Sequence, residues 1–267
     1  MTKIAVAGAG AVGAAVCRAL IQGIDGFELS AISDLNPDKA RSLIGLSVDV
    51  PFVAIGEIAN HADWVVEALP AAAVPALAEQ VLGQGKTLVM ISSAALLLYP
   101  ELIKKIQSTK GRVLVPSGAL IGMDGLNALA EHGVDSVELT TTKHPRSLQG
   151  APHIIKNAID LNSITSPTVI FSGNALEAAA AFPANVNVAA TLTVASRLSP
   201  ERVQVRVCAD PSMTSNRHEV VAKGAYSTLR FSVENMPDPA NPKSSALTAS
   251  SIIAMLRRHY SPFVIGT

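Results

Sequence analysis

The feature that most constrains this chain is a glycine-rich turn near its start. Residues 8–13 have the sequence GAGAVG, which fits the pattern G-x-G-x-x-G. The turn follows an apolar run at residues 3–7 that predicts a buried strand, and it opens an apolar-striped stretch at residues 11–22 that predicts a helix. A strand, a glycine turn and a helix in this order are typical of a domain that binds the pyrophosphate of a dinucleotide.

Each residue type in the turn has a physical reason. Gly8 permits the tight turn, Gly10 lets the backbone approach a pyrophosphate, and Gly13 lets the helix lie close to the strand. The helix start at Ala11 and Val12 then offers free N–H groups and the positive end of the helix dipole to the phosphates. We therefore expect these five residues to bind a dinucleotide cofactor; the alternative is a plain glycine turn.

An acidic residue at the end of the next predicted strand selects the cofactor. Asp34 lies 21 residues after Gly13. A carboxylate there accepts hydrogen bonds from the adenosine ribose hydroxyls and repels a 2′-phosphate, so NAD is favoured. Because Lys39 and Arg41 follow nearby, NADP stays an alternative. The other role open to Asp34 is to cap the helix that begins near Pro37.

The order of the predicted elements indicates two domains. Up to residue 115, short apolar strands alternate with helices, which predicts a parallel sheet with helices on both faces. Residues 202–209 and 227–233 alternate apolar and polar side chains, which predicts an antiparallel sheet with one covered face. We expect an α/β fold: a Rossmann-type parallel-sheet domain and an α+β domain with a largely antiparallel sheet. A final helix at residues 244–259 is expected to pack back on the first domain.

The change of pattern near Pro116 predicts the domain boundary. Residues 1–117 are expected to form the dinucleotide-binding domain, with 242–267 returning to it. Residues 118–241 are expected to form the domain for catalysis, substrate binding and dimerisation. Within it, residues 143–166 are polar with little periodicity and predict a loop.

Composition argues against several classes of protein. The 267 residues carry 21 Lys and Arg against 21 Asp and Glu, so the zero net charge speaks against a nucleic-acid or anionic-membrane partner. No apolar run reaches the roughly 20 residues that a membrane helix needs. Because Cys17 and Cys208 supply neither a disulfide framework nor a zinc site, we expect no metal and a cytoplasmic location. The low charged fraction, 16%, also favours a surface covered by a second subunit.

Six histidines are candidates for proton transfer, and the residue types alone do not rank them: His61, His132, His144, His153, His218 and His259. Four segments of the chain, however, resemble the L-aspartate dehydrogenase family. They are residues 8–13 with Asp34, residues 116–126, residues 182–190 and residues 241–245. The third and fourth segments, in this order after the second, are specific to that family.

The resemblance implies a fold, an activity and site residues. It implies a homodimer of chains with a Rossmann-type domain and a catalytic α/β domain. It also implies oxidation of L-aspartate to iminoaspartate with NAD or NADP, or the reverse reaction, the reductive amination of oxaloacetate. The iminoaspartate would feed NAD biosynthesis. The family's active-site histidine falls on His218, and its two cofactor contacts fall on Ile121 and Asn187. Smaller residues are usual at the position of Ile121.

Histidine suits the proton transfer that such a reaction needs. The substrate ammonium must lose a proton before its nitrogen can form a C=N bond, and histidine has an unperturbed pKa of about 6.5. We therefore assign His218 as the general base, with Asp210 or Glu219 as candidates to orient its ring. The imidazole is expected to face a nicotinamide held by the first domain.

A dicarboxylate substrate needs two anion sites. One group of candidates lies at residues 241–245, with Lys243 as the cation and three neutral donors: Asn241, Ser244 and Ser245. The alternative for this segment is a capped turn between domains. Asn185 is a candidate to hold the nicotinamide amide or the substrate, and its alternative, shared with Asn187, is to cap a helix.

The second anion site has weaker candidates in the predicted loop. Lys143 and Arg146 are cations that would suit a carboxylate. A solvated loop is the favoured interpretation of this stretch.

Two other functions fit parts of the pattern. Reductases of dihydrodipicolinate, homoserine or sugars share the layout, but they typically use a lysine or a paired His and Lys on motifs that we do not find here. A non-catalytic NAD-binding protein would keep the glycine turn without needing His218.

Overall fold

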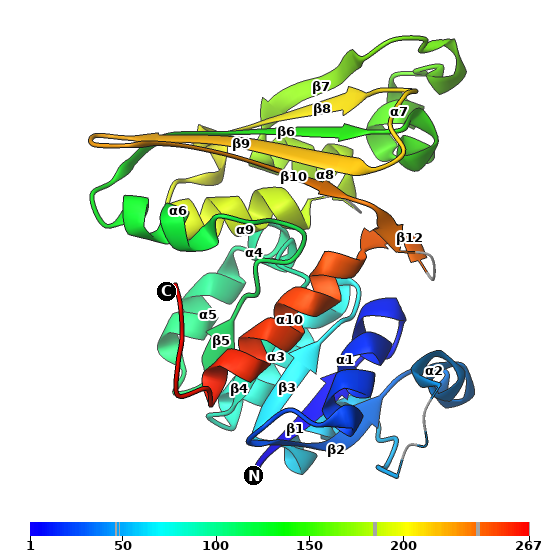
Figure 1. The fold of residues 1–267 in the computed structure, drawn as a ribbon, viewed down its shortest axis with the longest axis vertical. Helices are drawn as coiled ribbons and strands as arrows, with labels where there is room; N and C mark the ends of the chain where they lie inside the picture. Colours follow the sequence, from blue (N-terminus) through cyan, green and yellow to red (C-terminus); the bar gives the residue numbers. More distant parts are fainter. Residues whose placement is uncertain (46, 48, 184–185, 239–240, 267) are drawn as a thin grey trace. The chain divides into compact units, whose positions relative to one another are not determined.

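The alternating strands and helices of the first 118 residues form a five-stranded parallel sheet (Figure 1). The computed structural model of the chain describes residues 1–45, 47, 49–183, 186–238 and 241–266, and only the backbone of 237, 238 and 241–244. The described chain divides into two units. The first comprises Met1–Gly118 and Leu247–Ile265, and the second comprises Ala119–Ala246 with Gly266.

The sheet of the first unit has the strand order β2-β1-β3-β4-β5, and all its neighbouring strands are parallel. Its strands are β1 (Thr2–Ala7), β2 (Phe27–Ser33), β3 (Trp64–Glu67), β4 (Thr87–Met90) and β5 (Arg112–Leu114). Its helices are α1 (Ala11–Gln22), α2 (Pro37–Ile44), α3 (Val74–Gly83), α4 (Ala95–Leu98) and α5 (Glu101–Ser108), with the 3-10 turns η1 (Ile55–His61) and η2 (Ala71–Ala73). The chain leaves β1 for β2 on one side and reaches β3 on the other. Ligands of such sheets bind outside the carboxyl ends of the strands at this switch point.

The last helix, α10 (Ala246–His259), packs in the core of the first unit, as predicted. Ile252 and Leu256 are fully buried in a cluster with side chains of α1, β1 and β2. The predicted start of this helix at residue 244 was wrong, because residues 241–245 pair as a short strand, β12 (Asn241–Ser245), with β11 (Pro237–Asp238).

The second unit contains another five-stranded sheet, with the order β10-β9-β6-β8-β7. The β6–β8 pair is parallel and the others are antiparallel, as expected for a largely antiparallel sheet. Its strands are β6 (Val134–Lys143), β7 (Thr168–Asn174), β8 (Val203–Ala209), β9 (Asn216–Gly224) and β10 (Thr228–Asn235). The remaining elements are α6 (Met123–Ala130), α7 (Pro152–Lys156), α8 (Ala175–Ala181), α9 (Asn187–Ser196), η3 (Pro145–Leu148), η4 (Leu161–Ser163) and η6 (Pro200–Arg202).

One face of this second sheet, here called the inner face, is covered by α6, α8 and α9 (Figure 1). Side chains in β6, β8 and β9 alternate between buried positions on the inner face and more exposed positions on the opposite, outer face. This alternation is the period-two pattern that the sequence shows, and it decides which side chains can share a site.

The predicted loop at residues 143–166 is partly wrong. Lys143 is the last residue of β6, because the strand continues to pair with β8 up to Lys143↔Ala209. The residues that follow form η3, α7 and η4. Among the helices of the described residues, none has the length and apolar character needed to cross a membrane.

Candidate active site

The glycine turn after β1 has the geometry that a bound pyrophosphate needs. Gly8 has a φ of +87°, and a Cβ there would lie 2.5 Å from the Ala68 carbonyl oxygen. A Cβ on Gly13 would lie 1.8 Å from the Gly8 carbonyl oxygen, whereas a Cβ on Gly10 would meet nothing within 4 Å. The outer two glycines are therefore required by packing, and the middle one borders open space.

Helix α1 begins directly after this open space. Its N-cap is Gly10, which has no side chain to bond the first amides of the helix, at Ala11 and Val12. Those amides and the helix dipole favour an anion at the turn. The residues present therefore fit a dinucleotide phosphate.

Asp34 follows β2 and lies against the same turn. Its carboxylate accepts hydrogen bonds from the backbone N–H of Ala9 at 2.7 Å and of Asn36 at 2.8 Å. It does not cap α2, since that role belongs to Asn36, whose side chain accepts from the Lys39 N–H. Asp34 therefore lies beside the glycine turn, and the N-cap of α2 is Asn36.

Glu67 is a buried carboxyl that the sequence reasoning missed. It ends β3 with 0% exposure and accepts hydrogen bonds from the backbone N–H of Leu69 at 2.6 Å and of Ser92 at 3.0 Å. The Ser92 hydroxyl donates in turn to the Leu69 carbonyl at 2.6 Å. Burial raises the pKa of Glu67. The signal for it was an acid inside the apolar run at residues 64–68, since such residues are seldom buried without partners.

The contacts of Glu67 hold together two loops at the carboxyl edge of the sheet. One loop follows β3 and contains Ala68, whose carbonyl lies against Gly8. The other follows β4 and contains Ser92 and Ser93, both buried. Glu67 therefore supports the glycine turn without being part of it.

His218 is the histidine that lies on the inner face of the second sheet. It is 5% exposed and is paired in register with Thr141 of β6 and Val233 of β10. Its Nδ1 lies 3.1 Å from the Thr141 hydroxyl oxygen. Among the described residues no group bonds to Nε2, and the one fully buried side-chain N or O atom without a hydrogen-bond partner is Arg217 Nε. The Nε2 atom of His218 is therefore not completely buried, although the residue as a whole is 5% exposed.

The orienting partner of His218 differs from the two predicted acids. Asp210 accepts hydrogen bonds from the Ser212 hydroxyl and N–H, which lower its pKa, and Glu219 pairs with Arg217 on the outer face. When Nδ1–H donates to Thr141, the proton stays on that nitrogen and Nε2 carries the free lone pair. Thr141 was missed because it is 77 residues from His218 in the chain.

Burial and a nearby charge shift the pKa values of His218 and Lys143 on the inner face. Burial, together with the positive charge of Lys143, lowers the pKa of His218 to about 3. Burial lowers the pKa of Lys143, which is 7% exposed, to about 8. The imidazole is therefore neutral at physiological pH, as a general base must be.

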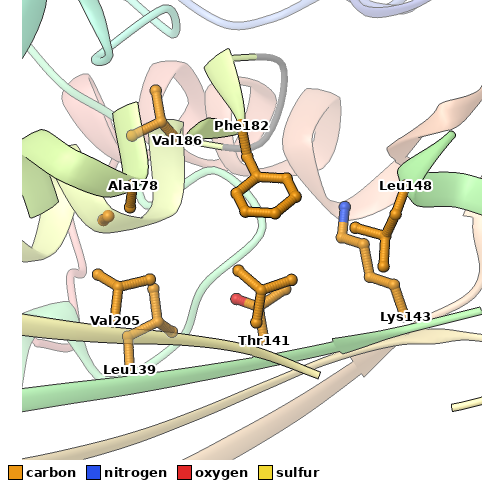
Figure 2. A pocket seen from close by; sticks show the side chains of 10 residues that line it. Leu139, Thr141, Lys143, Leu148, Ala178, Phe182, Val186 and Val205 are labelled. Carbon is orange, nitrogen blue, oxygen red and sulfur yellow. The ribbon is translucent and has the colours of Figure 1, made fainter. Parts of the chain in front are cut away.

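The side chain of Lys143 lies in mostly apolar surroundings on the inner face. Figure 2 shows Thr141 and Lys143 on the helix side of β6, with Lys143 running up between Leu148 and Phe182. Val186, at the N-cap of α9, lines the same pocket. Arg146, the other cation predicted for this stretch, is exposed in η3.

The other predicted contacts are spread over the second unit. Ile121 is 43% exposed just before α6, and Asn187 is the first residue of α9, whose N-cap is Val186. The buried Ser245 donates its hydroxyl to the Asn235 side-chain oxygen at 3.0 Å. For three predicted residues the structure describes only the backbone, in β12: Asn241, Lys243 and Ser244. Asn185 lies outside the described residues.

The remaining histidines make contacts of another kind. The rings of His132, His153 and His259 pack against aromatic side chains. His144 caps η3 with its side chain, and His61 is exposed at the end of η1. His218 is thus the one with a buried ring bonded to a hydroxyl.

Comparisons with known proteins match both halves of the chain. A family model described as aspartate dehydrogenase, C-terminal, matches residues 124–259, and one described as homoserine dehydrogenase, NAD binding domain, matches residues 8–116. L-aspartate dehydrogenase 3 of Bordetella bronchiseptica is 40% identical over 99% of this chain and 97% of that protein. L-aspartate dehydrogenase of Methanosarcina barkeri is 39% identical over the whole of both chains. A crystal structure of aspartate dehydrogenase from Thermotoga maritima has a TM-score of 0.76 at 26% identity, also over the whole of both chains.

Substitutions at Gly10 and Gly13 should distinguish a role in cofactor binding from a role in packing. We expect Gly13→Ala to lower the melting temperature, because its Cβ would overlap the Gly8 carbonyl. Gly10→Ala should leave the melting temperature unchanged and weaken NAD binding about 10-fold or more, since a methyl group would occupy phosphate space. Thermal unfolding and NAD titration measure the two effects, with Gly83→Ala as a control outside the turn. Full NAD affinity in Gly10→Ala would show that no phosphate binds there.

Replacing the Glu67 carboxylate should weaken NAD binding, although Glu67 is not part of the glycine turn. In Glu67→Gln one of two backbone N–H groups faces an amide that cannot accept its proton, at a cost of about 1–3 kcal/mol. We expect a lower stability and a rise of the NAD dissociation constant, measured by calorimetry. The matched control is Glu79→Gln, whose side chain is 68% exposed. If Glu67→Gln loses stability but binds NAD as well as the wild type, its carboxylate supports the sheet only.

Proposed function

Because the chain belongs to the aspartate dehydrogenase family, we propose that it oxidises L-aspartate to iminoaspartate with NAD or NADP. The observation that carries this proposal is the buried imidazole of His218, hydrogen-bonded to Thr141, within the segment that matches the family model. The first half matches a model named for another dehydrogenase, so the choice of substrate rests on the second half.

The first unit provides the cofactor-binding residues of the proposal. Gly8, Gly10 and Gly13 shape the turn, and the amides of Ala11 and Val12 donate to phosphate oxygens. Asp34 is proposed to bind the ribose hydroxyls, which favours NAD over NADP. A dinucleotide held by these residues would supply the hydride acceptor of the reaction. Two residues of the second unit are also proposed as cofactor contacts: Ile121 and Asn187.

The second unit provides the base of the proposal. His218 takes a proton from the substrate ammonium at Nε2, so that the nitrogen lone pair can form the C=N bond. The Thr141 hydroxyl oxygen accepts a hydrogen bond from Nδ1–H and keeps the ring in the tautomer that this step needs. In the reverse direction, the same nitrogen returns the proton to the amine. For substrate contacts we retain the predicted set: Asn185, Asn241, Lys243, Ser244 and Ser245.

We also propose a homodimer and a cytoplasmic location. The helices that pack on the second sheet lie on its inner face, which leaves its outer face to a second copy. Val221 lies on that outer face, half-buried among charged neighbours. Both cysteines are free thiols, which suits a reducing compartment.

The activity of His218 variants tests the proposed function. L-Aspartate, but not L-homoserine, should reduce NAD in the presence of the wild-type protein, seen as absorbance of the reduced nicotinamide. His218→Ala should lower kcat by about 10²–10⁴-fold without changing NAD affinity, because a positioned base contributes that much. His132→Ala, at a surface ring, is the control. A wild-type protein that binds NAD but oxidises no amino acid would contradict the proposal.

The oligomeric state is tested separately. Light scattering of the native protein should give twice the chain mass of 27.7 kDa. Val221→Arg should shift the mass toward the single chain, because an added charge on a packed face is costly. A single-chain mass for the wild type would exclude the homodimer.

A further inference from the structure

Lys143 shares the inner face with the proposed base. It is two residues from Thr141 in β6, and side chains two residues apart in a strand point to the same face. Thr141 is the residue paired with His218 and bonded to its ring. The ammonium and the imidazole therefore lie on one face of two adjacent strands, next to the carboxyl end of β6.

We infer that the Lys143 ammonium binds the α-carboxylate of the amino acid substrate beside the His218 imidazole. The inference rests on the proposed oxidation of L-aspartate and adds one of its two anion contacts. The α-carboxylate and the α-ammonium are attached to the same carbon. A base that takes the ammonium proton therefore has the α-carboxylate as a close neighbour, whereas the β-carboxylate is one carbon further away.

The surroundings of Lys143 strengthen such a contact. Its side chain is 7% exposed and lines a pocket with mostly apolar neighbours (Figure 2), among them Leu148 and Phe182. Attraction between opposite charges is stronger where water is scarce. A carboxylate that reaches this ammonium is therefore held more firmly than at an exposed lysine.

The charge of Lys143 also connects substrate binding to the strength of the base. In the free protein burial, and then the charge of Lys143, lower the pKa of His218. A carboxylate on Lys143 offsets that charge, so the imidazole binds a proton more readily when substrate is present. Of the neighbouring described acids, Asp210 is bonded to Ser212 and Glu219 lies on the outer face. The bound substrate carboxylate would therefore raise the pKa of the imidazole in the complex in which the proton is transferred.

Removing the cation tests the contact. Lys143→Met should raise the KM for L-aspartate by about 10- to 100-fold, because a hydrogen-bonded charge contact is lost. The KM for NAD should not change. The control is Lys223→Met, an exposed lysine of β9. Thermal unfolding should show that Lys143→Met is folded, since methionine fills a similar apolar volume.

The pH dependence of KM separates a substrate contact from a structural lysine. Burial lowers the pKa of Lys143 to about 8, so the wild-type cation is lost above that pH and the KM for L-aspartate should rise. Lys143→Arg keeps its charge at every accessible pH, so its KM should stay level over the same range. Lys143→Met should have a high KM throughout. The same rise in all three proteins would overturn the inference.

A third measurement identifies the carboxylate. L-Asparagine keeps the α-carboxylate, and L-isoasparagine carries an amide in its place. Both compounds are tested as competitive inhibitors. The inhibition constant of L-asparagine should rise about 10-fold or more in Lys143→Met, and that of L-isoasparagine should not change. The reverse pattern, or an unchanged KM for L-aspartate, overturns the assignment of Lys143. Oxidation of L-aspartate by the wild type remains the separate test of the proposed function.

Discussion

The pairing of β6 with β9 is the constraint on which the proposed chemistry of this protein depends. Side chains alternate between the two faces of a strand, so a shift of one residue would move His218 to the outer face and away from Thr141. The register is supported from both sides, because β9 also pairs with β10 and β6 also pairs with β8. Inner strands of a sheet hold a side chain more accurately than a loop does, and a proton-transfer group needs that accuracy.

In each unit a buried titratable group is hydrogen-bonded to the backbone or to a neighbouring strand. Glu67 accepts from two backbone N–H groups, and His218 is bonded to a hydroxyl on the neighbouring strand. Such groups keep their orientation, but burial changes their affinity for protons. Burial raises the pKa of Glu67 and lowers that of His218, since in both cases the charged form loses its hydration. For the carboxyl this favours the protonated form, and for the imidazole it favours the neutral form that can accept a proton.

The sequence predicted the fold class well where local periodicity decides it. The parallel order of the first unit and the alternation in β8 and β10 follow from apolar spacing, and both are confirmed. The errors occur where pairing between distant segments overrides local character. Lys143 is polar and was predicted to begin a loop, but β6 extends to Lys143 because this residue still pairs with Ala209 of β8. Residues 241–244 look like a helix start, but pairing with β11 makes them extended.

The amino-acid sequence by itself determined the glycine turn and the acid that follows β2, because a tight turn and a close helix demand glycine whatever surrounds them. It also determined the family, through motifs that lie in short continuous segments. Only the tertiary structure decided which side chains act on His218. Thr141 is 77 residues away from it, and Lys143 acts through its charge on the same face. Glu67 likewise bonds to Ser92, 25 residues later. Contacts of this kind leave no local pattern, because they arise only when strands pair.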